Sequence, residues 1–443
     1  MQVIHLIDYV LLPFYCVAAF AVVYYFRKKA NPDPSSNRIY FISFSLKILG
    51  GIASALIFQY YYGTGDSLIY FDEARILHGH ILKSPSNIRF LFNDASNLRQ
   101  LYDPSVNFVI HNFYNSNTVA TIRFTTLITF LSANTYITTT ILFSLISFTG
   151  VWAIYKVFIL KYPTQKRLLA WSILYLPSIV FWCSGISKDT ICLAAFGWLF
   201  FSVYQVFVFR NHQIKYFLLI FVCGIVIWFI KSYIILVILI TLGLVGIIYL
   251  FFSLKPLKVR VALVSIFIVT LIIILNTENF ITHAADNYTA GFIVDKIQEM
   301  QHNYENTDSG ANFKIGNIDP SLAGLLQEIP TSIGTVLFRP FIWESEKLLT
   351  FISGLENFLL LLLTVFVIIK SRIINLLKVL HDDTLILFCL VFALVFASVI
   401  GLTTFNFGTI IRYKTIFMPF YISFLILLNH KTNLIRIRKR NLQ

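Results

Sequence analysis

The sequence contains few charged residues. Asp, Glu, Lys and Arg make up 13% of its 443 residues, whereas hydrophobic types make up 57% and the mean hydropathy is +0.76. Soluble domains usually contain about 25% charged residues. The composition therefore excludes a water-soluble domain. It predicts an integral membrane protein whose 44 phenylalanines and Ile-rich runs surround a helical bundle.

Signatures of several other classes are absent. The sequence has no Walker-type Gly-rich loop, no HExxH and no metal-ligand spacing among its nine histidines. No CxxC pair occurs either. We interpret the five cysteines as small buried hydrophobic residues: Cys16, Cys183, Cys192, Cys223 and Cys389.

The formal charge of +14 would suggest a nucleic-acid partner in a soluble protein. Here the basic residues lie mainly in short segments between apolar runs, so their distribution reports membrane topology. We expect no nucleic-acid partner.

Apolar runs long enough to cross ~30 Å of hydrocarbon predict about eleven spans within one all-α transmembrane domain over 1–443. They lie near 3–26, 39–62, 135–158, 168–183, 190–209, 216–230, 233–252, 260–276, 350–369, 384–403 and 414–430. The runs within 168–209 and 216–252 are expected to form tight hairpins, with turns at Ser184–Asp189 and Lys231–Ser232. The first run reads as a retained helix rather than a signal peptide. Lys47, inside the second run, is expected to snorkel inward.

The basic residues predict an outside N-terminus and a cytoplasmic C-terminus. In this orientation the inner segments hold 21 of the 35 Lys and Arg residues, those within 27–38, 156–167, 210–215, 255–260, 370–378 and 431–440. Two outer loops are long, 63–134 and 277–349, and loops of this length usually carry function. The apolar pattern of the first loop predicts helices along the membrane surface.

The first loop opens on acidic residues within Gly63–Ser67 and beyond. A carboxylate beside lipid loses hydration, so it can act as a base on a sugar hydroxyl. Asp66 is the candidate base, with Tyr70, Asp72 and Glu73 following it. The same residues also describe a turn in which Asp66 caps a helix, and the two interpretations are compatible.

Cations recur at the outer membrane boundary, although basic residues usually favour the inner side. These residues are Lys188, Lys231, Arg339, Arg412 and Lys414. A cation in lipid costs ~2.5 kcal/mol or more at mid-bilayer and less at the interface, so an anion is expected nearby. A lipid-linked phosphate or diphosphate would meet them at this depth. The alternative is that each cation snorkels or pairs with a neighbour such as Asp189 or Glu344.

Three motifs are similar to those of GT-C class membrane glycosyltransferases and related polysaccharide-assembly proteins. They are Tyr61–Tyr70 after a span, Leu176–Asp189 as a hairpin, and Arg412-Tyr413-Lys414 followed by Pro419. The chain departs from the class in having an extra span before the acidic loop, no clean Asp-Glu pair in that loop and no large C-terminal outer domain. Asp72 and Glu73 would substitute for the pair.

The resemblance implies a GT-C-like fold in a bacterial inner membrane and a polyprenyl-phosphate-linked sugar as donor. Asp66 would deprotonate the hydroxyl of a glycan, lipid or protein acceptor, and the cations would stabilise the leaving phosphate. The resemblance implies no certain cofactor and leaves open a divalent metal ion held by Asp66. Two alternatives remain: an O-antigen-type polymerase or ligase, and a lipid-linked glycan flippase.

Overall fold

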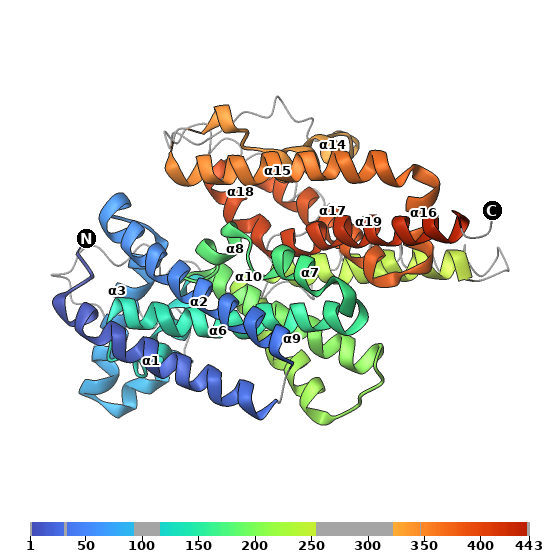
Figure 1. Ribbon diagram of the computed structural model, residues 1–443. Coiled ribbons are helices and arrows are strands. Elements are labelled where there is room, and N and C mark those ends of the chain that lie inside the picture. Colours follow the sequence, from blue (N-terminus) through green and yellow to red (C-terminus); the bar gives the residue numbers. More distant parts are fainter. Residues whose placement is uncertain (1, 31–32, 93–115, 254–321, 346, 441–443) are drawn as a thin grey trace, which may run out of the picture. The chain divides into compact units, whose positions relative to one another are not determined.

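The computed structural model describes residues 2–30, 33–92, 116–253, 322–345 and 347–440 (Figure 1). Within these ranges the chain forms helices and no β-strand. Seven helices are long and apolar enough to cross a membrane, and the bent pair Phe407–Ile416 and Met418–Ile437 gives an eighth candidate. The expectation of an all-helical, multi-pass membrane protein is therefore confirmed. The count of eleven stays a prediction, and the run at 260–276 lies outside the described residues.

The chain divides into two compact units, Met1–Ile235 and Leu236–Gln443. Unit 1 contains α1 (Leu6–Lys29), α2 (Pro34–Leu56), the π-helix η1 (Ile57–Tyr62), α3 (Asp66–Lys83), η2 (Pro85–Leu91), α5 (Ser116–Thr129), α6 (Tyr136–Lys161), η5 (Pro163–Gln165), α7 (Lys166–Ile173), α8 (Pro177–Trp182), α9 (Lys188–Phe207) and the first part of α10 (Ile214–Ser253). Its central helix is α6, which packs against α1, α2 and α9. Most of α6 is buried, including Thr138, Thr139, Thr140, Ser144 and Ser147.

Two glycines bring α6 and α9 into close contact. A Cβ atom added to Gly197 of α9 would lie 2.1 Å from the carbonyl oxygen of Gly150 on α6, and one added to Gly150 would lie 2.4 Å from the Ala194 oxygen. Small residues at such positions let helix backbones approach closely, which is a main source of helix association in lipid.

We expect Gly197→Ala to destabilise the protein by about 1–3 kcal/mol, because the new methyl group overpacks the α6–α9 contact. The matched control is Gly224→Ala in α10, where an added Cβ has nothing within 4 Å. That change should stabilise the helix by about 0.5–1 kcal/mol. Thermal unfolding in detergent checks both, and equal unfolding temperatures for the two variants would contradict the close contact.

The apolar run at 168–183 is not one helix. It forms α7 and α8, which are separated by three residues before Pro177 opens α8. Proline lacks an amide donor and disfavours helical conformation in the residue before it, so the helix cannot continue through this point. The segment therefore brings irregular backbone to the interior of the bundle.

The expected hairpin at 216–252 is a helical stretch, α10, with one break. Lys231 has non-helical backbone angles, φ −149° and ψ 77°, and separates two helical parts. The break lies at the predicted turn. An unbroken helix of 40 residues would be about 60 Å long, twice the hydrocarbon thickness.

The helices predicted for the first outer loop are present as α3, η2 and α5, while residues 93–115 lie outside the described ranges. Leu68, Phe71 and Leu77 are buried, and α3 packs against α5. The apolar face of α3 is therefore covered by protein.

Unit 2 contains the second part of α10, α14 (Leu322–Phe338), η6 (Ile342–Glu344), α15 (Leu348–Ser371), α16 (Ile373–Asp382), α17 (Thr384–Thr403), α18 (Phe407–Tyr413), η7 (Lys414–Ile416) and α19 (Met418–Arg440). Its core is α17, packed between α14 and α19, with α15 also on α19. The part of the second outer loop that the structure describes holds α14 and η6.

Candidate functional site

Three helix ends of unit 1 are held together by buried hydrogen bonds. The Gln59 side chain, in η1, accepts from the amide of Val3 at 2.9 Å, just before α1. Asp8 of α1 accepts from the amide of Ile137, in the first turn of α6, at 2.8 Å. The start of α1, the end of η1 and the start of α6 therefore lie at one end of the bundle, where the acidic loop begins.

Two glycines turn the chain from η1 into α3. Gly63 has φ 67° and Gly65 has φ 144°, values that favour glycine, and a Cβ on Gly65 would meet the Phe58 ring at 2.8 Å. Gly65 is the N-cap and Asp66 is the first helical residue. Asp66 thus lies one position beyond the cap expected from the sequence, where the helix dipole still favours its negative charge.

One face of α3 carries three of the predicted site residues. Asp66, Tyr70 and Glu73 are spaced i, i+4 and i+7, which places them on the same side of the helix. Asp66 is exposed, whereas Tyr70 and Glu73 are buried. Asp72 lies off this face and pairs with Arg75 at 2.7 Å. Glu73, rather than Asp66, is thus the carboxyl that loses hydration.

Contacts on the neighbouring positions fix α3 against α6. The hydroxyls of Ser67 and Tyr136 lie 2.7 Å apart, and the Phe71 ring meets the Tyr136 ring edge to face at 5.3 Å. Tyr136 is fully buried in the first turn of α6. These contacts position the Asp66–Glu73 face relative to the bundle.

The irregular chain between α8 and α9 is held by side chains. Lys47 Nζ, buried within α2, donates to Ser147 Oγ and to the carbonyl oxygens of Ile179 and Cys183 at 2.8–3.0 Å. The expectation that Lys47 snorkels is therefore wrong, because its side chain is 1% exposed. The Lys47 ammonium thus supplies a donor to the backbone at the end of α8, where low-polarity surroundings require polar groups to be hydrogen-bonded.

Lys188 joins the start of α9 to the first outer loop. Its Nζ donates to Thr118 Oγ1 of α5 at 2.8 Å and lies 5.8 Å from the centre of the Tyr70 ring. One predicted cation thus lies beside the α3 face that carries Asp66, Tyr70 and Glu73.

The next residue forms a buried ion pair. Asp189 accepts from Lys231, at the break in α10, at 2.5 Å, and the two side chains are 0% and 6% exposed. The alternative prediction, that a cation such as Lys231 pairs with a neighbouring carboxylate, is therefore confirmed for this residue. The break in α10 and the start of α9 are joined by this contact.

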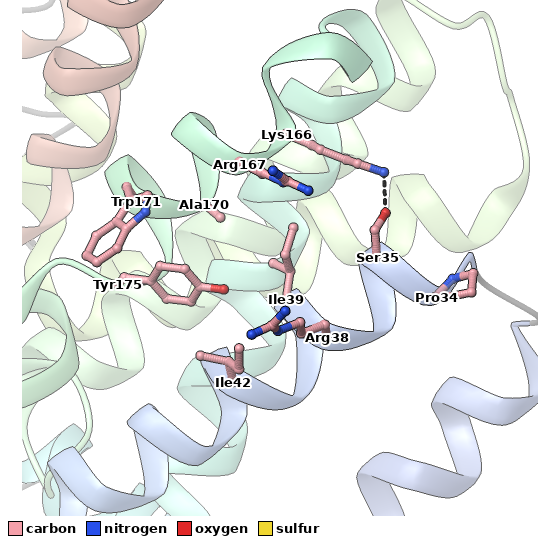
Figure 2. A pocket seen from close by; sticks show the side chains of 10 residues that line it. All are labelled: Pro34, Ser35, Arg38, Ile39, Ile42, Lys166, Arg167, Ala170, Trp171 and Tyr175. Atoms are coloured by element: carbon pink, nitrogen blue, oxygen red, sulfur yellow. Dashed lines mark hydrogen bonds between the residues drawn. The ribbon is translucent and has the colours of Figure 1, made fainter.

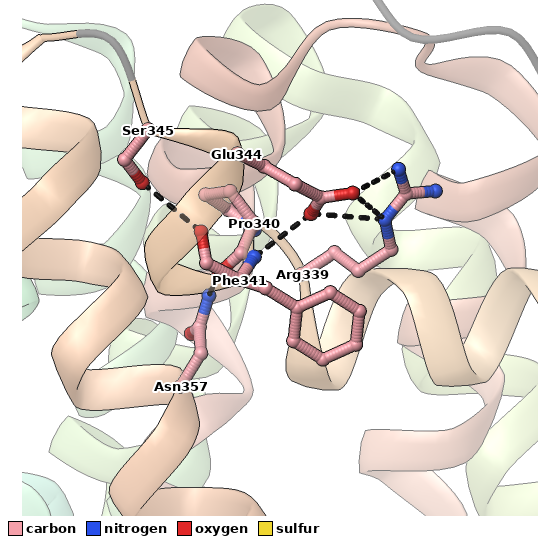
Figure 3. A network of polar contacts seen from close by, with 6 residues as sticks. All are labelled: Arg339, Pro340, Phe341, Glu344, Ser345 and Asn357. Atoms are coloured by element: carbon pink, nitrogen blue, oxygen red, sulfur yellow. Dashed lines mark hydrogen bonds and ion pairs between the residues drawn. The ribbon is translucent and has the colours of Figure 1, made fainter.

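In unit 2, Arg339 is also paired. Its guanidinium makes three hydrogen bonds of 2.5–3.1 Å to the Glu344 carboxylate, which also accepts from the Phe341 amide at 2.8 Å (Figure 3). Burial raises the pKa of Glu344, but these hydrogen bonds and the Arg339 charge outweigh it. The pKa therefore lies below its ordinary value of 4.5.

This lowered pKa predicts a pH dependence of stability. The ionised Glu344 should contribute fully to the free energy of unfolding above pH 4.5, its ordinary pKa. This contribution should be lost as the pH falls through the lower pKa of the folded state. Glu344→Gln and Arg339→Gln should each destabilise the protein by about 1–2 kcal/mol at pH 7. In detergent, the unfolding temperature of each variant should also fall less steeply than that of the wild type as the pH drops below 4.5. A wild-type slope in Glu344→Gln would contradict this role.

Lys414 lies in the same region of unit 2. Its Nζ donates to Asn357 Oδ1, and Asn357 Nδ2 donates to the Pro340 carbonyl at 3.1 Å. Both Lys414 and Asn357 are buried in the described unit. Asn357, whose bond to Pro340 is drawn in Figure 3, therefore links Lys414 to the turn that carries Arg339. Arg412, on α18, is half-buried.

The predicted site residues thus fall into two groups, each within one unit. Unit 1 holds Asp66, Tyr70, Asp72, Glu73, Lys188, Asp189 and Lys231, whereas unit 2 holds Arg339, Glu344, Arg412 and Lys414. That all five cations share one anion stays a prediction. Within the described ranges no three His, Cys, Asp or Glu side chains gather as metal ligands, and metal dependence is still open.

The sequence analysis missed two connecting residues, Asn357 and Thr118. A signal was available for Asn357, because a single amide within an apolar span is costly unless it is hydrogen-bonded. Thr118 carried no comparable signal, since threonine is common on helices of every kind.

No match is found when the chain is compared with models of protein families, with curated proteins or with solved structures.

Proposed function

We propose that the protein is a membrane glycosyltransferase of GT-C-like fold that transfers a sugar from a polyprenyl phosphate to an acceptor outside the cytoplasm. The observation that carries the proposal is the contact between α3 and α9: Lys188 lies beside Tyr70, on the helix face shared by Asp66 and Glu73. A cation and the helix face that carries two acidic residues thus come from distant parts of the sequence and lie side by side.

In this proposal the exposed Asp66 accepts the proton of the acceptor hydroxyl, whose oxygen attacks the anomeric carbon. The bond between that carbon and the phosphate oxygen breaks, and Lys188 stabilises the negative charge on the leaving lipid phosphate. The hydrogen bond from Lys188 to Thr118 keeps this cation oriented.

We place the protein in a bacterial inner membrane, and the charge distribution supports an orientation with the N-terminus outside. The end of unit 1 opposite the acidic loop carries Arg27, Lys28, Lys29, Arg38, Lys161, Lys166 and Arg167. Such a basic end is typical of the cytoplasmic side. The candidate site then faces outward, where nucleotide sugars are absent and a lipid-linked donor is needed.

The test is a donor assay with purified protein in lipid nanodiscs. We expect labelled sugar to pass from a polyprenyl phosphate to an acceptor in an envelope-lipid and glycan extract, and not from a nucleotide sugar. Product only from polyprenyl-diphosphate oligosaccharides would overturn this in favour of a polymerase or ligase. Movement of lipid-linked glycan across the bilayer without product would favour a flippase.

A further inference from the structure

At the opposite end of unit 1 from the candidate site, a cavity of about 500 Å³ opens between the first turns of α2 and the segment 166–175 (Figure 2). It is lined by three cationic side chains, two aromatic rings and an apolar wall. The polar members are Ser35, Arg38, Lys166, Arg167 and Tyr175. We propose that this cavity binds the phosphodiester headgroup of an anionic phospholipid.

The charge of the cavity favours an anion. The positive charge of Lys166 is neutralised by the Asp33 carboxylate, which lies 3.2 Å away, and the Lys166 ammonium also donates to Ser35. Hydrogen bonds from Ser35, Ser36 and Lys166 keep the pKa of Asp33 well below its ordinary range, so this carboxylate stays charged. Neither Arg38 nor Arg167 makes an ion pair among the described residues, and two positive charges therefore remain at the cavity.

The geometry suits a phosphate group. Arg38 extends from α2 and Arg167 from α7, so the two guanidinium groups reach the cavity from facing helices (Figure 2). Guanidinium groups bind phosphate oxygens in pairs through a planar fork of donors. A cavity with cations from two walls can hold one phosphate between them.

The apolar wall points to a lipid as the source of that phosphate. Trp171 and Ile42 line the cavity and are 65% and 41% exposed, and Leu168 beside it is 51% exposed. In a membrane these side chains face acyl chains, and tryptophan is typical of the headgroup level. Basic cavities between membrane helices at this depth bind lipid headgroups.

Trp171 provides the measurement. We would place the full chain in nanodiscs containing a small fraction of brominated phosphatidylglycerol or, separately, brominated phosphatidylcholine, both of which quench tryptophan on contact. The fluorescence of Trp171 is obtained by subtracting the fluorescence of the Trp171→Phe variant from that of the wild type. We expect phosphatidylglycerol to reach half-maximal quenching at about 25-fold lower mole fraction, since each of the two arginines near an anionic lipid contributes a factor of about five.

Arg38→Gln with Arg167→Gln should remove this preference, and Arg38→Lys with Arg167→Lys should retain most of it. The matched control is Lys28→Gln with Lys29→Gln, two exposed cations at the same end of unit 1 but outside the cavity. A preference lost equally in that control would overturn the site, because general surface charge would then explain it. Displacement by millimolar inorganic phosphate would show a free-phosphate site and overturn the lipid assignment.

Discussion

Replacing Asp66 by Asn is expected to lower the rate of sugar transfer by about 10²–10⁴-fold, the usual contribution of a general base. The amide keeps the size of the side chain but has no basic oxygen to take the hydroxyl proton. Asp66 is exposed at the first position of α3, so the substitution should leave folding intact. Turnover in nanodiscs with a polyprenyl-phosphate sugar is the measurement.

The matched control is Asp72→Asn on the same helix. Asp72 lies off the Asp66–Glu73 face and pairs with Arg75 at 2.7 Å, so this change should alter turnover by no more than about twofold, the scale of a surface ion pair. Equal losses in both variants would point to a general effect of charge in the loop. Wild-type turnover in Asp66→Asn would remove the assigned base and favour the polymerase reading.

Asp189→Asn should destabilise the protein by about 3–5 kcal/mol, because it leaves Lys231 as a buried charge without its carboxylate. The two side chains are 0% and 6% exposed, so water cannot replace the lost partner. The expected result is a large fall in unfolding temperature and loss of the single peak in size-exclusion chromatography. An Asp189→Asn protein as stable as wild type would contradict the buried pair.

The double variant Asp189→Asn with Lys231→Met separates two roles of Lys231. Replacing both charges by neutral groups should restore most of the stability, since no buried ion remains. If Lys231 also binds the donor phosphate, the restored protein will still transfer sugar slowly. Full turnover in the stable double variant would assign Lys231 to structure alone.

The fold class could be predicted because lipid imposes a strong constraint. Apolar runs such as Thr384–Thr403, whose most apolar 18 residues have a mean hydropathy of 3.0, have few alternatives to a membrane helix. The predicted turn at Lys231 also coincides with a break in the helix. The run 168–183 was predicted to be one helix because apolar composition does not distinguish a span from two short helices; Pro177 was the available signal.

The site was harder to predict because pairing is a tertiary property. Lys188 and Tyr70 are 118 positions apart, and only packing shows that they meet. The sequence suggested Glu344 as a partner for Arg339, since the two residues are only five positions apart. Lys47 was misread because a lysine near apolar residues is compatible with both snorkelling and a buried hydrogen-bonded position.

The three bonds of Lys47 have a consequence for biogenesis. The Cys183 carbonyl, which accepts from Lys47 at 2.8 Å, would lose this donor if segment 166–187 entered lipid alone, which is costly. Since α2 is synthesised earlier, its lysine is present when the translocon releases this segment. We therefore expect the insertion of residues 166–187 to depend on α2, an N-terminal helix that is already in the membrane.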